Sequence, residues 1–311
     1  MAGEGVDPQA VQEAQLAKEA REPELLGLPN VVGVGIGFKE VKGKATKDVA
    51  LVVYVEKKLP KKDLPRNAVV PQECDGTKTD VVETGRLEAL ANTARIRPCR
   101  PGFSLGHYRI TAGTFGCLVR DRCPPCRTYI LSNNHVLANS NGASPGDPVL
   151  QPGRHDGGAY PRDLVARLAR FVPIRFGSPD RYNLVDAALA LPVDLRAVIG
   201  PIHGLGLPTG TAEATLGQAV VKTGRTTGTT AGRVTGIDAT VAVGYGARGT
   251  AYFRNQIITS NMSQGGDSGS LLLERAGRRA VGLLFAGSSR ITIHNTIHNV
   301  LIALGVELVV A

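Results

Sequence analysis

The sequence of 311 residues has no tryptophan, and aromatic residues make up only 5% of it. A hydrophobic core must therefore be built mainly from Val, Leu, Ile and Ala. Glycine, by contrast, is abundant at 38 residues, and it favours short strands joined by tight turns over long helices. With 42% hydrophobic and 20% charged residues, the composition predicts a globular, mainly β protein that is long enough for two domains.

An export signal and a membrane segment are also missing. The amino terminus has no basic start followed by an apolar stretch, and no apolar run approaches the length of a membrane span. We therefore expect a cytoplasmic protein with no membrane partner. The cysteines fit this expectation, because their number is odd and their spacing is not that of a secreted disulfide framework; they are Cys74, Cys99, Cys117, Cys123 and Cys126.

The pair Cys123-Pro-Pro-Cys126 allows three interpretations. A single C-x-x-C supplies two zinc ligands where a structural site usually needs four, and Cys99, Cys117 and His107 lack a diagnostic spacing to complete the set. A redox disulfide is the second interpretation, although no thioredoxin-like β-α-β pattern follows. The third, a turn with incidental thiols, is the one that the pattern favours. We predict no metal and no cofactor.

Positive charge exceeds negative charge, and the formal net charge of +9 raises the question of an anionic partner. The basic residues are scattered, however. The clearest run, residues 57–62, has no interleaved aromatic side chains of the kind on which single-stranded nucleic acids stack. No helix-turn-helix, zinc-finger or Walker pattern appears. The sequence therefore argues against a nucleic-acid partner.

The first hundred residues indicate a small α/β domain. Residues 8–21 are rich in helix formers, and the β-rich runs 31–38 and 49–55 predict a hairpin. The glycines of the first run are spaced G-x-G-x-G and precede a turn, so they do not match a dinucleotide loop, which needs a helix there. A short strand near 79–83 and a proline-rich linker follow, and we place the domain boundary between residues 100 and 101. The function of this first domain is left open between regulation and oligomerisation.

From residue 108 onward, short apolar runs recur between turn signals, a pattern typical of antiparallel barrels or a sandwich. These runs are residues 116–119, 129–132, 187–190, 219–222, 232–234, 257–259 and 270–273. A terminal helix is expected at about residues 296–304. Residues 101–311 are therefore interpreted as a second, mainly β domain.

Three residues of this second domain suit amide hydrolysis, which needs a nucleophile, a base and donors for an oxyanion. Ser268 stands in Gly-Gly-Asp-Ser-Gly, a tight loop that exposes its hydroxyl and aims the N–H groups of Gly266 and Ser268 at one point. His135 follows an apolar strand in Ile-Leu-Ser-Asn-Asn-His-Val. Asp186 opens the small-apolar strand Asp-Ala-Ala-Leu-Ala and can hold the imidazole in one tautomer.

Rival residues have weaker contexts. The nearest alternative carboxylates, Asp180 and Asp194, lie near prolines in exposed-looking segments. The remaining histidines have no comparable surroundings; they are His107, His155, His203, His294 and His298. In the order His135, Asp186, Ser268, the chain on either side of Asp186 is long enough for about one barrel. This arrangement suits a site between two barrels.

This combination resembles the chymotrypsin-like serine peptidases. The likeness is carried by the Gly-Asp-Ser-Gly loop, by the histidine segment and by Gly113-Thr-Phe-Gly-Cys-Leu-Val upstream of it, and it covers about residues 108–305. Ser-Asn-Asn-His-Val and the segment Lys-x-Gly-Arg-Thr-Thr-Gly that begins at Lys222 look most like cytoplasmic bacterial members related to the plant narrow-leaf proteins. The resemblance implies two six-stranded antiparallel β-barrels, a short C-terminal helix and peptide-bond hydrolysis without a cofactor.

The resemblance also places a primary specificity pocket. Its floor falls at Met262, and its wall at Phe285, Ala286 and Gly287. A methionine offers no charge to a basic side chain, so we expect an apolar residue before the cleaved bond.

One departure from the family concerns Asp267, which precedes the nucleophile. In secreted members a new amino terminus pairs with this aspartate, and Val31-Val32-Gly33 superficially resembles such a terminus. That segment lies 104 residues before His135, too far for the usual arrangement. Asp267 must therefore find another partner, or the oxyanion loop forms poorly until something binds.

We predict from these features an intracellular serine endopeptidase that acts on a protein or peptide substrate, with regulation, one dedicated substrate protein and a homo-oligomer all left open. The alternative is a catalytically latent or inactive peptide-binding scaffold on the same fold. Serine-directed covalent labelling separates the two.

Overall fold

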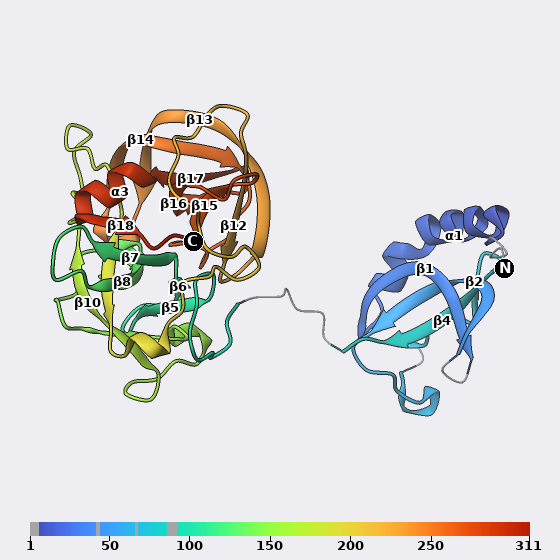
Figure 1. Cartoon of the computed structure of the whole chain (residues 1–311). Coiled ribbons are helices and arrows are strands. Elements are labelled where there is room, and N and C mark those ends of the chain that lie inside the picture. Colours follow the sequence, from blue (N-terminus) through green and yellow to red (C-terminus); the bar gives the residue numbers. More distant parts are fainter. Residues whose placement is uncertain (1–5, 42–43, 66–67, 86–91) are drawn as a thin grey trace. The chain divides into compact units, whose positions relative to one another are not determined.

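The computed structural model describes residues 6–41, 44–65, 68–85 and 92–311, and it divides into two compact units, Met1–Glu88 and Ala89–Ala311 (Figure 1). The first unit is small and combines one helix with a sheet. The second contains the rest of the described strands. Of the helices in the described ranges, none combines the length and the apolar character needed to cross a bilayer.

The first unit is a four-stranded sheet covered by helix α1 (Pro8–Leu26). The sheet order is β1-β2-β4-β3, in which β1 pairs antiparallel with β2, and β2 pairs parallel with β4. The strands are β1 (Val31–Val41), β2 (Lys44–Val55), β3 (Glu73–Cys74) and β4 (Thr77–Glu83). Helix α1 begins where the Asp7 carboxylate accepts a hydrogen bond from the Gln9 N–H, and its apolar face packs on Leu51 and Val53. The predicted hairpin is confirmed.

The glycines of β1 make room for the side chains of β2. A Cβ atom placed on Gly35 would lie 3.2 Å from the Tyr54 ring, and one placed on Gly37 would lie 3.0 Å from the Val52 side chain. The strand continues past these glycines to Val41 and stays paired with β2. The spacing therefore serves strand packing, as expected, and no helix follows it.

The second unit consists of two antiparallel β-sheet layers. The first is an eight-stranded sheet in the order β18-β7-β8-β11-β10-β9-β5-β6. Its strands are β5 (Ser104–His107), β6 (Gly113–Thr114), β7 (Cys117–Asp121), β8 (Thr128–Ser132), β9 (Pro148–Leu150), β10 (Leu164–Phe171), β11 (Ala188–Pro192) and β18 (Val306–Leu308). Six strands were expected here; the sheet is larger because β6 pairs with β5 and the late strand β18 pairs with β7.

The second layer is a closed barrel in the order β12-β13-β14-β17-β16-β15, with the six strands expected. They are β12 (Ala219–Gly224), β13 (Gly228–Gly244), β14 (Thr250–Ser260), β15 (Leu271–Glu274), β16 (Ala280–Gly287) and β17 (Ile291–Thr296). Helix α3 (Ile297–Leu304) follows, in agreement with the predicted terminal helix. The mainly β, two-barrel prediction is thus confirmed. Short helical segments are α2 (Asn134–Leu137), η1 (Lys61–Asp63), η3 (Arg154–Asp156), η4 (Leu195–Ala197) and η5 (Gly246–Arg248).

One hydrophobic cluster joins the two layers. It combines residues of β7 and β8, such as Val119 and Leu131, with Leu273 of β15 and Leu283 of β16, and α3 adds Leu301. All five side chains are at most 4% exposed. Burial of this shared apolar surface fixes the two layers against each other, and with them the residues at the ends of their strands.

The segment 92–100, which the sequence analysis assigned to the first domain, bonds to the second unit. The Asn92 N–H donates to the Arg225 carbonyl at 2.7 Å, and the Cys99 N–H donates to the Ala197 carbonyl at 2.7 Å. Arg95 forms an ion pair with the buried Asp163. These contacts place the division of the chain at residues 88 and 89, before the segment that reads as a linker.

Candidate active site

His135 and Asp186 meet where two strands of the first layer end. His135 lies in α2, directly after β8, and Asp186 lies two residues before β11. The distance from His135 Nδ1 to Asp186 Oδ2 is 2.6 Å, and the His135 N–H donates to Asp186 Oδ1 at 3.2 Å. The Asp186 side chain is fully buried, whereas that of His135 is 24% exposed.

Backbone anchors hold this pair in place. The Asn133 side-chain amide donates to the Asp186 carbonyl at 2.7 Å, and the Asp186 N–H donates to the Asn295 Oδ1 atom at 3.0 Å. A carboxylate is an acceptor only, so the short contact places the imidazole proton on Nδ1 and leaves Nε2 as the basic nitrogen. His135 Nε2 has no partner among the described residues, so it is free to accept a proton.

A third donor reaches the same carboxylate. The hydroxyl of Tyr245, which follows β13, donates to Asp186 Oδ2 at 2.7 Å. The pKa of Tyr245 is raised well above its ordinary value, mainly by burial and to a smaller extent by the charge of Asp186. The hydroxyl therefore keeps its proton and acts as a donor.

Ser268 lies in the turn between β14 and β15. The Ser268 carbonyl accepts from the Thr114 N–H at 2.8 Å, which ties this turn to the first layer. A Cβ atom placed on Gly113 would clash with Val136 and would lie 3.1 Å from the Ser268 carbonyl. Val136, which follows His135, and Ser268 therefore both flank Gly113. The Ser268 side chain is half-buried, and its hydroxyl makes no hydrogen bond, to His135 or otherwise, within the described ranges.

The loop presents two unused backbone donors. Within the turn, the Asp267 N–H donates to the Gln264 carbonyl and the Gly269 N–H donates to the Leu284 carbonyl. Neither Gly266 nor Ser268 uses its N–H for a hydrogen bond in the part of the chain that the structure describes. Gly266 has φ of 97°, a conformation that glycine adopts without strain. Paired free donors of this kind suit an oxyanion.

Asp267 has a full set of partners. Its carboxylate accepts from the backbone N–H groups of Thr226 and Thr227 at 2.8 and 3.1 Å, and from the Gln264 N–H at 3.0 Å. Lys222 Nζ lies 3.1 Å from Asp267 Oδ2, with both side chains fully buried. Burial lowers the pKa of Lys222, and the Asp267 charge opposes this effect. The open question of a partner for Asp267 is thus answered by an internal lysine.

Arg225 supports the loop from the other side. Its guanidinium forms an ion pair with Asp156, and the Asp156 carboxylate also accepts from the Ser104 hydroxyl at 2.5 Å. The Thr114 hydroxyl accepts from the Arg225 N–H at 2.9 Å and donates to the Gly266 carbonyl at 2.9 Å. The carbonyl of Gly266 is therefore fixed, which orients the peptide groups of the loop.

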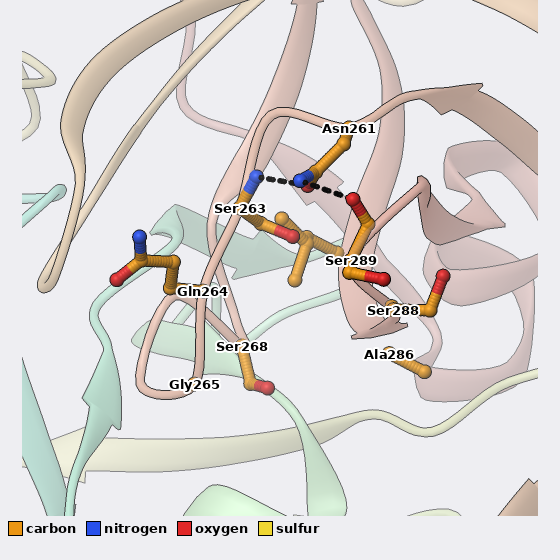
Figure 2. Close-up of a pocket in the computed structure, with 10 residues that line it drawn as sticks. Asn261, Ser263, Gln264, Gly265, Ser268, Ala286, Ser288 and Ser289 are labelled. Carbon is orange, nitrogen blue, oxygen red and sulfur yellow. Dashed lines mark hydrogen bonds between the residues drawn. The ribbon is translucent and has the colours of Figure 1, made fainter.

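A pocket of about 490 Å³ opens beside Ser268 (Figure 2). It is lined by Asn261, Ser263, Gln264, Gly265, Ser268, Leu284, Ala286, Gly287, Ser288 and Ser289. Figure 2 shows the Asn261 side chain between the Ser263 N–H and the Ser289 carbonyl, to which it is hydrogen-bonded. No ionisable side chain lines the pocket.

Two predicted pocket residues lie elsewhere. Met262 does not form the floor: its side chain is 4% exposed and packs in the barrel core against Val220 and Val234, because alternate residues of an extended chain point to opposite faces. Phe285 lines an adjoining groove of about 620 Å³ together with His135 and Tyr245. Ala286 and Gly287 line both hollows and so connect them.

The rival residues do not join this site. Asp194 caps η4, and Asp180 bonds within its own loop to Ser178. His107 is paired with Asp147, and burial lowers the pKa of His294 to about 3. All five cysteines are unpaired thiols, with Cys123 and Cys126 exposed between β7 and β8. Among the described residues, no group of three or more His, Cys, Asp or Glu side chains is placed to hold a metal ion.

Sequence reasoning missed two residues of the site. Lys222 was noted only as the start of a motif, although a lysine in an otherwise apolar strand is a signal of a buried ion pair. Tyr245 gives no such signal, because a tyrosine in the run Gly-Tyr-Gly looks like an ordinary hairpin tip.

Comparison with known proteins supports the fold. No family model matches the chain. Narrow Leaf 1 of Oryza sativa subsp. japonica is 25% identical over 309 residues, which cover 83% of this chain and 51% of that protein. Streptogrisin-A of Streptomyces griseus is 45% identical over 75 residues, 24% of this chain and 23% of that protein. The chain thus spans about half or less of the length of these curated relatives.

Among solved structures, the Nocardiopsis protease NAPase superposes with a TM-score of 0.50 at 17% sequence identity, over 68% of this chain and 99% of that chain. At this identity the likeness concerns the fold. The predicted resemblance to the chymotrypsin-like serine peptidases is confirmed at that level, and the second unit has their two-barrel architecture.

Proposed function

We propose that the chain is a serine endopeptidase in which Ser268 is the nucleophile, His135 the general base and Asp186 the carboxylate that orients the base. The observation that carries this proposal is the 2.6 Å contact of His135 with a fully buried Asp186, beside a loop that presents free N–H groups. A buried carboxylate that fixes an imidazole in one tautomer has an evident use when that imidazole must accept a proton.

In the proposed reaction each of these residues has one role. The Ser268 hydroxyl attacks the peptide carbonyl carbon while its proton passes to His135 Nε2, and the N–H groups of Gly266 and Ser268 hold the oxyanion. His135 then gives the proton to the leaving amine as the C–N bond breaks, which leaves an acyl-serine. Water, deprotonated by His135, cleaves the acyl bond and restores the serine. No cofactor is required.

The pocket supports a preference for an uncharged residue before the cleaved bond. An apolar residue was expected from Met262, but that side chain is not in the pocket. Leu284 and Ala286 offer apolar contact, whereas Asn261 and Ser263 offer hydrogen bonds, so apolar and small polar side chains both fit. We would abandon this preference if a peptide library were cleaved only after Arg or Lys.

The surroundings of Asp267 favour a working site over a latent scaffold. The latent alternative rested on two features, an aspartate without a partner and a first domain of unknown role, and the structure bears on the first of them. Lys222 and the backbone of Thr226 and Thr227 supply partners from within the chain, so the oxyanion loop needs no new amino terminus to form.

The substrate is proposed to be a protein or peptide, and the site of action the cytoplasm, where the buried Cys99 and Cys117 thiols stay reduced. Regulation, a dedicated substrate and self-association through the first unit remain proposals.

Covalent labelling tests the proposal. The purified full chain is treated with a fluorophosphonate probe, beside the variants Ser268→Ala and His135→Ala, and the adduct is located by mass spectrometry. Ser144→Ala and His203→Ala, at exposed positions, are the matched controls. An adduct on Ser268 in the wild type and both controls, lost in Ser268→Ala and His135→Ala, is expected. A wild-type protein that forms no adduct would overturn the proposed function.

A further inference from the structure

The Asp186 carboxylate receives only one side-chain hydrogen bond from outside His135 among the described residues. His135 donates twice, from its N–H at 3.2 Å and from Nδ1 at 2.6 Å. The third bond comes from the Tyr245 hydroxyl at 2.7 Å. Because Tyr245 and the imidazole converge on the same oxygen, Oδ2, the tyrosine fixes the atom on which the base depends.

Tyr245 reaches this position from the tip of the β13–β14 hairpin, in the barrel that also supplies Ser268. Its ring is half-buried, stacks on Phe253 at 6.3 Å between centroids, and meets Phe176 edge-on at 5.5 Å. The His135 ring also lies edge-on to it, at 6.1 Å. These contacts hold the ring through its carbon atoms, so loss of the hydroxyl alone leaves the packing in place.

We propose that Tyr245 is a positioning residue: its hydroxyl holds Asp186 in the orientation that accepts the His135 Nδ1 proton. As a statement about catalysis this rests on the proposed peptidase function, whereas the hydrogen-bond relay itself does not. A carboxylate with two fixed donors on one oxygen cannot rotate without breaking both bonds, and a charge-assisted bond of this kind is stronger than a neutral one. A residue next to the closed barrel thus completes the hydrogen bonds of His135 and Asp186, which belong to the layer of the eight-stranded sheet.

The position also connects the base to the groove. Tyr245 lines the same hollow as His135 and Phe285, so a bound peptide packs against the ring whose hydroxyl orients Asp186. Because the ring persists in a phenylalanine variant, peptide binding is preserved while orientation is lost. Tyr245→Phe should therefore lower kcat and leave KM nearly unchanged.

The variant Tyr245→Phe tests the inference, and Tyr252→Phe is its matched control. Tyr252 lies on the opposite strand of the same hairpin, and its hydroxyl has no hydrogen bond within the described ranges. We expect the rate of fluorophosphonate labelling at neutral pH to fall by about tenfold in Tyr245→Phe, the effect of one charge-assisted hydrogen bond, and to be unchanged in Tyr252→Phe. His135 and Tyr245 are the titratable side chains that contact Asp186 among the described residues. Loss of one donor leaves more negative charge on Asp186 to favour the imidazolium, so the acid limb of the rate profile should move to higher pH.

A second readout does not depend on activity. The Nδ1 proton of His135 gives a low-field proton NMR signal when it is bonded to a carboxylate, and we expect this signal to move or broaden in Tyr245→Phe and to stay in place in Tyr252→Phe. An unchanged signal in Tyr245→Phe overturns the inference, whether or not the wild type reacts with the probe. Labelling by the wild type with an equal rate in Tyr245→Phe overturns it as well. A wild type that fails to label contradicts the proposed function instead, and the NMR comparison still decides the role of Tyr245.

Discussion

The Nζ atom of Lys222 lies 3.1 Å from Oδ2 of Asp267, and neither side chain has any exposed surface. The pair sits under the loop that carries Ser268. Two charges buried together stabilise each other, but either one left alone is costly, because it has neither water nor a partner. The conformation of the loop therefore depends on a lysine within the barrel.

Lys222→Met should destabilise the protein by about 3–5 kcal/mol, the cost of breaking a buried ion pair from one side. The measurement is urea unfolding followed by circular dichroism. Arg196→Met serves as the control, because it removes an ion pair on the surface, where Arg196 is 92% exposed. That control should change stability by less than about 1 kcal/mol. Equal effects in the two variants would show that the buried pair contributes no more to the free energy of unfolding than the surface pair does.

Gly266→Ala should abolish labelling of Ser268 without unfolding the protein. Gly266 has φ of 97°, and a Cβ atom there would lie 2.5 Å from the Thr226 hydroxyl and 2.9 Å from Arg225 Nη1. The loop must shift, and its free N–H groups shift with it. Gly217→Ala is the control, because Gly217 also has a positive φ, of 78°, but a Cβ there meets nothing within 4 Å. Full labelling of Gly266→Ala would refute the assigned oxyanion site.

Asp186→Asn should lower kcat by roughly ten thousand-fold at neutral pH, since an amide nitrogen in place of a carboxylate oxygen favours the wrong imidazole tautomer. The rate is measured on a peptide selected from the library. Asp180→Asn, in an exposed loop, should leave it unchanged. A loss of less than tenfold in Asp186→Asn would mean that this carboxylate does not orient the base.

Lowering the pH should reduce the stability that the Asp156 carboxylate contributes through its ion pair with Arg225. Burial raises the pKa of this carboxyl, but the Arg225 guanidinium and the Ser104 hydroxyl lower it more, so the net pKa is below its ordinary value. A carboxyl with a depressed folded-state pKa contributes stability above its unfolded value of about 3.9 and loses that contribution as the pH falls through the folded value. The difference in unfolding free energy between wild type and Asp156→Asn should therefore narrow below about pH 4. A constant difference between pH 6 and pH 3, measured by urea unfolding, would contradict this.

The candidates Ser268, His135 and Asp186 could be identified from sequence because each lies in a short local motif with its own strand. Each motif consists of residues that are consecutive in the chain, so it can be recognised without knowledge of the three-dimensional structure. The overall class followed in the same way from glycine content and from the recurrence of short apolar runs.

The specificity pocket was harder to predict, because it depends on which face of an extended segment a residue occupies. Met262 and Ser263 are neighbours, yet one packs in the barrel core and the other lines the pocket. A shift of one residue reverses the facing of every side chain in such a segment. Tyr245 was missed for a related reason: its contact with Asp186 spans 59 residues and two barrels, and no local pattern records it.

The pairing of β18 with β7 determines when the eight-stranded sheet of the second unit can be completed. Val306–Leu308 is hydrogen-bonded to Val119–Asp121. β7 is translated early, but its partner β18 lies almost at the end of the described residues. A nascent chain would therefore leave this edge of β7 unpaired while the ribosome still makes the second layer. Asn295, whose side chain accepts from the Asp186 N–H, is likewise synthesised after Ser268. Ribosome-bound chains halted before residue 306 should be far more sensitive to added protease than released full-length protein. Equal resistance would show that the sheet is stable without its last strand. If the proposed peptidase function holds, this order separates the synthesis of the chain from the first time at which it can cleave a substrate.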